Sequence, residues 1–197
     1  MSSTAIANMA LSHIGHGSIE TLDEDSAEAN ACKTWYDHSR RQSLEAHDWN
    51  FARKRQTLAL HSEAAPSGVW AYRYQYPSGC LKIRSLVNPL GATADAVPYE
   101  VELDGAGKTM CLLTDLAEAV AVFTFDLTTT ALFSPAYIDV LSYLLAHRIA
   151  MPITTDARIE NAKLEMYLYL LQVATVGNDN EQVQPPARDA EVIRARN

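Results

Sequence analysis

Residues 105–109, GAGKT, match the last part of a phosphate-binding loop motif. Such a loop serves nucleotide hydrolysis. A complete loop has another glycine five positions before the second one, where this chain has Glu102. The loop must also lead into a helix, but a short apolar run and then Asp115 follow Thr109. We therefore expect a glycine-rich β-hairpin loop, made of Asp104, Gly105, Ala106, Gly107 and Lys108.

Two groups of residues have types that bind metal ions. His13 and His16 have the spacing of a ligand pair, but a glycine separates them and no third ligand is indicated. The acidic run at residues 23–28 would need a glycine in sixth place to bind calcium, and Glu28 stands there. Helix capping explains these carboxylates better. We expect no metal and no cofactor.

The sequence evidence for a catalytic nucleophile is equally weak. Cys32, Cys80 and Cys111 are widely spaced and contain no CxxC pair, so we expect reduced, mostly buried thiols. Cys32 and His38 are six residues apart on an expected helix and point to different faces. No G-x-S-x-G motif is present, and a pair of glycosidase carboxylates would meet only in the fold. We assign no catalytic residue.

Composition narrows the class of protein. The chain has 197 residues, with 48% hydrophobic and 20% charged residues, as in ordinary soluble proteins. Its formal charge of −8 argues against a surface that coats nucleic acid. We interpret the basic run Arg53-Lys54-Arg55 as a solvated face or a salt-bridge set. With no signal peptide and no apolar run of membrane-spanning length, we expect synthesis in a cytoplasm and no membrane contact.

Apolar periodicity predicts helices at both ends of the chain. The first two cover about residues 3–14 and 26–47, with Arg40 and Arg41 in solvent. After Pro135 a third helix should end at Pro152, and a fourth should begin after Thr154 or Thr155 and close at Gly177. The expected core anchors are Trp35, Trp49, Phe51, Leu141, Leu145 and Leu168.

The sequence of the middle third predicts β-strands. Aromatic residues alternate through residues 70–76, and residues 119–127 are rich in valine and phenylalanine. We expect a mainly α fold with a small β-unit: a bundle of about four helices, an antiparallel β-hairpin projection and an extended C-terminal tail. As one structural domain, it would comprise N-terminal helices (1–62), a β-rich projection (69–130), C-terminal helices (135–177) and the tail (178–197).

The tail is polar and contains Pro185-Pro186, so it cannot bury enough surface to fold alone. It is either frayed or an arm that orders on a partner.

Three stretches together resemble the head-to-tail adaptors of short-tailed bacteriophages, the tail tubular protein A group. The first is ALSHIGHGSIETLDEDSAEANACKTWYDHSRRQSLEAHDWNFARKRQTLAL, with an Ile-Gly helix end, an acidic turn, a long helix and then Trp-x-Phe-Ala before a basic pair. The others are WAYRYQYPSGCLKIRSL and LFSPAYIDVLSYLLAHRIAMPIT. The resemblance covers about residues 5–176, in order, and is weakest over the hairpin and the tail.

The resemblance implies a non-enzymatic virion protein at the head–tail junction, assembled in the bacterial host cytoplasm. Twelve copies would form a ring between the portal protein and the tail nozzle protein. Double-stranded DNA would pass through the channel without sequence-specific binding, and an acidic β-unit would suit such a wall.

Two contact surfaces follow as hypotheses. The hairpin loop 104–108 would face the tail, and residues 178–197 would dock on the portal. The expected portal contacts are Val183, Pro185, Pro186, Arg188, Val192, Ile193 and Arg194. Two alternatives remain open: another neck or tail-completion protein, and a tail-associated cell-wall hydrolase.

Overall fold

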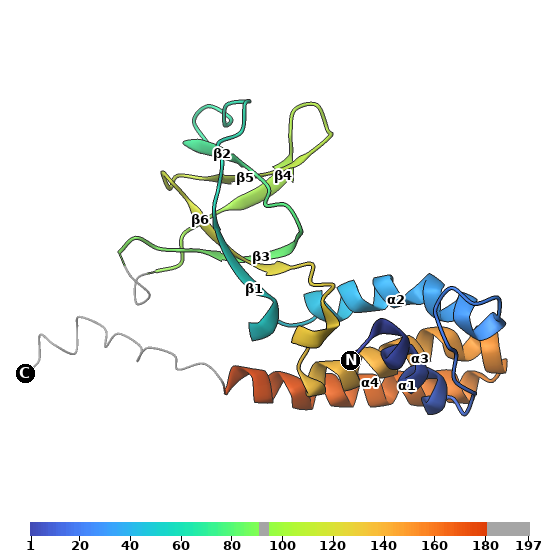
Figure 1. Cartoon of the computed structure of the whole chain (residues 1–197). Helices are drawn as coiled ribbons and strands as arrows, with labels where there is room; N and C mark the ends of the chain where they lie inside the picture. Colours follow the sequence, from blue (N-terminus) through green and yellow to red (C-terminus); the bar gives the residue numbers. More distant parts are fainter. Residues whose placement is uncertain (91–94, 181–197) are drawn as a thin grey trace, which may run out of the picture. The chain divides into compact units, whose positions relative to one another are not determined.

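A computed structural model describes residues 1–90 and 95–180 of the chain. These residues divide into two compact units (Figure 1). We call residues 1–52 and 126–180 the helical unit, and residues 53–90 and 95–125 the β unit. The chain therefore leaves the helical unit after Ala52 and returns to it at Asp126.

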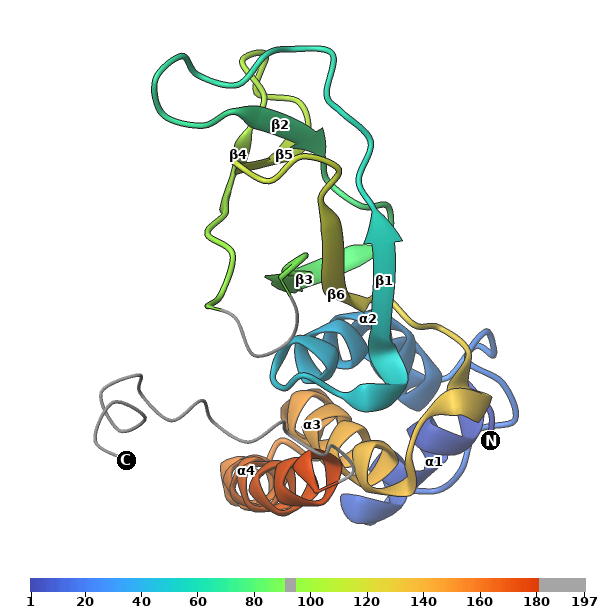
Figure 2. The same ribbon diagram turned by 90° about the vertical axis from the view of Figure 1, so that its left-hand side faces the viewer.

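The helical unit is organised around its third helix, which packs against the other three (Figure 2). That helix has ten buried residues, because apolar side chains point in almost every direction around it. A helix that is apolar on all sides must be covered on all sides. The elements are α1 (Ser3–His13), α2 (Ala27–Glu45), η1 (Asn50–Ala52), η2 (Thr130–Leu132), α3 (Pro135–Thr154) and α4 (Ala157–Asp179).

The helix ends follow local side-chain chemistry. Ser2, Ser26, Ser134 and Asp156 each accept a backbone N–H from the first turn and are the N-caps of α1, α2, α3 and α4. The prediction that Pro152 ends α3 is wrong. The helix continues to Thr154 and is capped by Thr155, which has a left-handed backbone (φ 54°).

The β unit contains two antiparallel sheets of three strands. One has the order β1-β6-β3 and the other β2-β5-β4 (Figure 2). Both contribute to one core, in which Tyr74, Ile83, Leu112 and Phe123 are buried. The strands are β1 (Arg53–Thr57), β2 (Tyr72–Gln75), β3 (Cys80–Leu86), β4 (Glu100–Leu103), β5 (Met110–Thr114) and β6 (Val120–Phe125).

The predicted fold class is wrong: the protein is α+β, not a mainly helical bundle with a hairpin projection. The β part has its own core and two sheets. The prediction failed at β1, whose sequence RKRQT is exposed at every position and carries no apolar alternation. Only its pairing with β6, from Arg53↔Thr124 to Thr57↔Val120, makes it a strand.

Three of the predicted core anchors, Trp49, Leu141 and Leu145, are fully buried. Trp35 and Phe51 are partly buried. Leu168 departs from the prediction, since 55% of its surface is exposed. It lies on the side of α4 away from α3, whereas Tyr167 and Ala174 take the buried positions.

Arg40 is more buried than predicted. It was expected in solvent but is only 2% exposed, because Asp126 and the carbonyl of Leu127 bind its guanidinium. The neighbouring Arg41 is exposed, as expected, and binds the other oxygen of Asp126 at 2.9 Å.

Candidate functional site: an apolar surface on the last helix

An aromatic cluster joins η1 to the start of α3. The ring of Tyr137 lies 5.3 Å from Trp49, 5.0 Å from Phe51 and 4.9 Å from Phe133, centroid to centroid, in edge-on arrangements. The hydroxyl of Tyr137 donates to the carbonyl of Arg40, and burial raises its pKa. Trp49 donates to the carbonyl of Ser43 at 2.8 Å. The cluster is therefore rigid and has its buried polar groups satisfied.

Asn178 holds the end of α4 against η1. Its side-chain oxygen accepts the backbone N–H of Asn50 at 2.8 Å, and its backbone carbonyl accepts from the side chain of Asn50 at 2.8 Å. The Nε2 of His47 lies 3.0 Å from a carboxylate oxygen of Asp179 and 2.9 Å from the side-chain nitrogen of Asn178. The last turn of α4 is thus held against η1 by polar contacts, although few of its side chains are buried.

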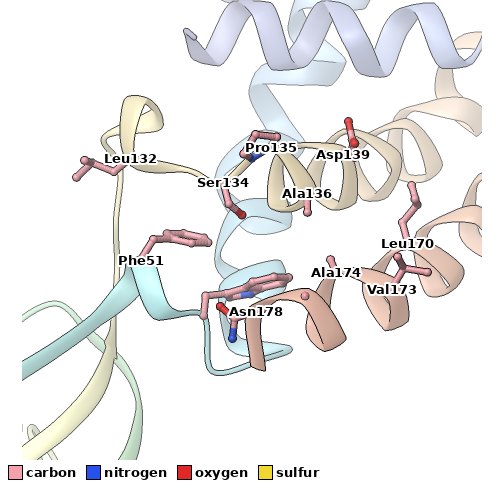
Figure 3. A pocket seen from close by; sticks show the side chains of 12 residues that line it. Phe51, Leu132, Ser134, Pro135, Ala136, Asp139, Leu170, Val173, Ala174 and Asn178 are labelled. Atoms are coloured by element: carbon pink, nitrogen blue, oxygen red, sulfur yellow. The ribbon is translucent and has the colours of Figure 1, made fainter. Parts of the chain in front are cut away.

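A cavity of about 710 Å³ lies between these elements (Figure 3). Phe51 comes from η1, Leu132 from η2, and Leu170, Val173 and Ala174 from α4. Asp139 is the single charged residue of the lining. A mostly apolar lining with a few polar groups is typical of pockets that bind apolar groups.

The cavity continues into an exposed apolar stripe on α4. Met166, Tyr169, Val173 and Val176 follow one another at spacings of three and four residues, so they share a helix face. Tyr169 is 60%, Val173 52% and Val176 59% exposed. Val173 belongs to both features. We call the stripe and the cavity together the α4 surface.

The hairpin prediction is confirmed. β4 pairs with β5 from Glu100↔Leu113 to Leu103↔Met110, and Gly107 has a φ of 66° in the connecting loop. No helix follows. The loop N–H groups already have protein acceptors: Gly105 donates to Glu63, and Gly107 and Lys108 donate to Asp104. Such a loop does not offer its backbone to phosphate. Residues 105–108 are exposed.

The other candidate groups serve structural roles. The Nε2 of His13 lies 3.1 Å from the hydroxyl of Ser142, while His16 is directed to Glu28. In the acidic run, Asp23 binds Lys33 and Glu24 accepts from Glu20 and Ser26. Within residues 1–90 and 95–180, no three histidine, cysteine or acidic residues come together as a metal site.

The cysteines are shielded. Cys32 and Cys111 are buried and Cys80 is partly buried, each as a free thiol. Burial raises the pKa of Cys32 to about 11, so at neutral pH this residue stays a thiol rather than a nucleophilic thiolate. The expected portal-contact residues, from Val183 to Arg194, lie outside the described residues.

Sequence reasoning missed the α4 surface. The signal was present, because α4 carries apolar residues on more than one face, including Met166, Tyr169, Leu170 and Val173. The sequence analysis did not assign these apolar residues to any partner.

In the part of the chain that the structure describes, no helix is both long and apolar enough to span a bilayer. Comparison with protein-family models and with curated proteins found no match for this chain.

Proposed function

We propose that this chain is a structural subunit of a phage head-to-tail adaptor. Twelve copies, the number implied by the resemblance, form a ring between the portal and the tail nozzle, and double-stranded DNA passes through it. The α4 surface is the observation that carries the proposal. Large exposed apolar patches are rare on soluble monomers and mark places where another protein binds.

In this proposal the portal covers the α4 surface. α4 ends at Asp179, and the segment proposed to dock on the portal begins at residue 178, so the two would form one continuous contact. The hydrogen bonds between Asn178 and Asn50 hold the end of α4 in place before binding, which lowers the entropy cost of association. The hairpin loop 104–108 is the proposed contact with the tail nozzle.

The decisive experiment is native mass measurement and negative-stain microscopy of the full chain, alone and mixed with the portal ring encoded beside it. We expect a closed ring seated on the portal in the mixture, and its mass gives the copy number. Monomers that never associate with the portal would overturn the proposal. A peptidoglycan zymogram on the same preparation separates an adaptor from a cell-wall hydrolase.

A further inference from the structure

The charges of the β unit are segregated between its two sheets. Strands β1, β6 and β3 carry five cations and no acid: Arg53, Lys54, Arg55, Lys82 and Arg84. The other described residues of the unit carry two cations, Arg73 and Lys108, and seven acids, Glu63, Asp95, Glu100, Glu102, Asp104, Asp115 and Glu118. A unit with equal numbers of both signs therefore has one basic end and one acidic end.

Each end presents an edge strand. β1 pairs only with β6, and β4 pairs only with β5. Among residues 1–90 and 95–180, no backbone hydrogen bond is made by the outer edge of either strand. Such edges can add a strand from another chain, and charged side chains decide which strand that is.

On the basic edge, Arg53 and Arg55 stand at alternate positions and so share one side of the sheet. Both side chains are exposed, and neither side chain forms a hydrogen bond or an ion pair within the described part of the chain. Lys54 between them points the other way, with its ammonium 4.5 Å from the centre of the Phe125 ring. Two cations thus remain available on the solvent side of β1.

On the acidic edge, Glu100 and Glu102 have the same alternate spacing, with Val101 between them packed on the core. Glu100 is exposed and accepts the neutral indole N–H of Trp70 at 3.0 Å, and within residues 1–90 and 95–180 no cation forms an ion pair with it. Glu102 binds Arg73 at 2.8 Å, but Arg73 is already paired with Glu63. The edge therefore carries excess negative charge.

We propose that the β1 edge of one copy pairs with the β4 edge of the next, so that Arg53 and Arg55 lie beside Glu100 and Glu102 of the neighbour. Main-chain hydrogen bonds would supply affinity, and the opposite charges would select the partner strand. Two different surfaces of one chain make a head-to-tail contact, which closes into a ring when its rotation allows. This inference rests on the proposed ring and names the contact between its copies.

DNA phosphates are the other polyanion that the basic edge could meet. The second copy is favoured because this same chain presents acids at the spacing that matches Arg53 and Arg55, on an edge that is also unpaired. The acids of the other sheet and its loops would repel DNA.

Two charge reversals of the full chain test the inference, Arg53→Glu with Arg55→Glu, and Glu100→Arg. Glu102 is left unchanged because Arg73, which is buried, depends on it. Ring formation is measured by native mass in the condition where wild type assembles, alone or on the portal. Each reversal should weaken the contact between copies about tenfold or more, and raising the salt should weaken the wild-type contact.

Mixing the two variants tests the charge pairing between copies more directly than either variant alone. In an equimolar mixture with alternating copies, half of the contacts carry the wild-type charges and the other half regain one opposite-charge pair, at position 100, while Glu102 keeps its sign. Rings should therefore form more readily in the mixture than with either variant alone. Asp95→Lys changes an exposed charge of the same unit outside β1 and β4 and should assemble like wild type.

Several outcomes would overturn the inference. It fails if wild type forms rings and both reversals do so equally well, or if the mixture assembles no better than the separate variants. Loss of binding to a short DNA duplex by the arginine variant, with ring formation intact, would assign the edge to DNA instead. Absence of any wild-type ring, alone or on the portal, would instead reject the proposed function itself.

Discussion

Arg40 on α2 and Asp126, at the point where the chain re-enters the helical unit, form an ion pair across 86 residues of sequence. The guanidinium is buried, whereas the carboxylate keeps 17% of its side-chain surface exposed and also binds Arg41. The pair ties α2 to the segment that leads into η2 and α3.

Asp126→Asn should destabilise the helical unit by about 2 to 4 kcal/mol, because it leaves a buried guanidinium without its main counter-charge. The measurement is urea unfolding followed by circular dichroism. Asp37→Asn is the matched control, since Asp37 also binds Arg40 but its side chain is 78% exposed. That control should cost under about 1 kcal/mol. Equal losses in both variants would contradict this assignment.

His13 should make stability depend on pH. Desolvation, with the charge of Lys163 adding to it and that of Asp139 opposing it, lowers the pKa of this imidazole from 6.5. Above pH 6.5 the ring is neutral whether the chain is folded or unfolded. As the pH falls below 6.5 the unfolded chain takes up the proton first, so the free energy of unfolding decreases until the pH passes the folded pKa.

Unfolding of wild type and His13→Gln at pH 8 and pH 5 measures this effect. The loss of stability between the two pH values should be smaller in the variant. An NMR titration of the His13 ring in the folded protein should give a pKa below 6.5, and a value above it would disprove the prediction.

The α4 surface should be needed for binding to the portal. Tyr169→Ser with Val173→Ser should lower portal affinity about tenfold or more, because each large apolar side chain contributes about 1.5–3 kcal/mol when buried. Surface plasmon resonance on immobilised portal rings provides the measurement. Val69→Ser removes a side chain that is 63% exposed in the β unit and should bind normally. Wild-type affinity in the double variant would show that the portal does not cover this surface.

Lengthening the hairpin loop should separate tail attachment from ring formation. Two glycines inserted after Ala106 move the loop tip but leave β4 and β5 paired, so rings should form on the portal and the nozzle should fail to attach. Co-sedimentation with nozzle protein measures the attachment. The same insertion after Ser67, in another exposed loop, should have no effect. Normal nozzle binding by the hairpin variant would rule out that contact.

Local sequence signals were sufficient to predict the hairpin, the four helices and part of the core. Turn chemistry was sufficient for the hairpin, because a glycine-rich loop between two apolar alternations admits few other structures. The spacing of apolar residues was likewise sufficient for four helices, and the choice of Trp49, Leu141 and Leu145 as core residues followed from the same pattern.

Only the tertiary structure decided the rest, because it depends on residues far apart in the chain. β1 has no apolar pattern and becomes a strand through hydrogen bonds to β6. Arg40 is buried because Asp126 neutralises it, and Leu168 is exposed because α3 covers another face of α4. Periodicity records that a residue is apolar or charged, whereas burial depends on which partner the fold brings to it.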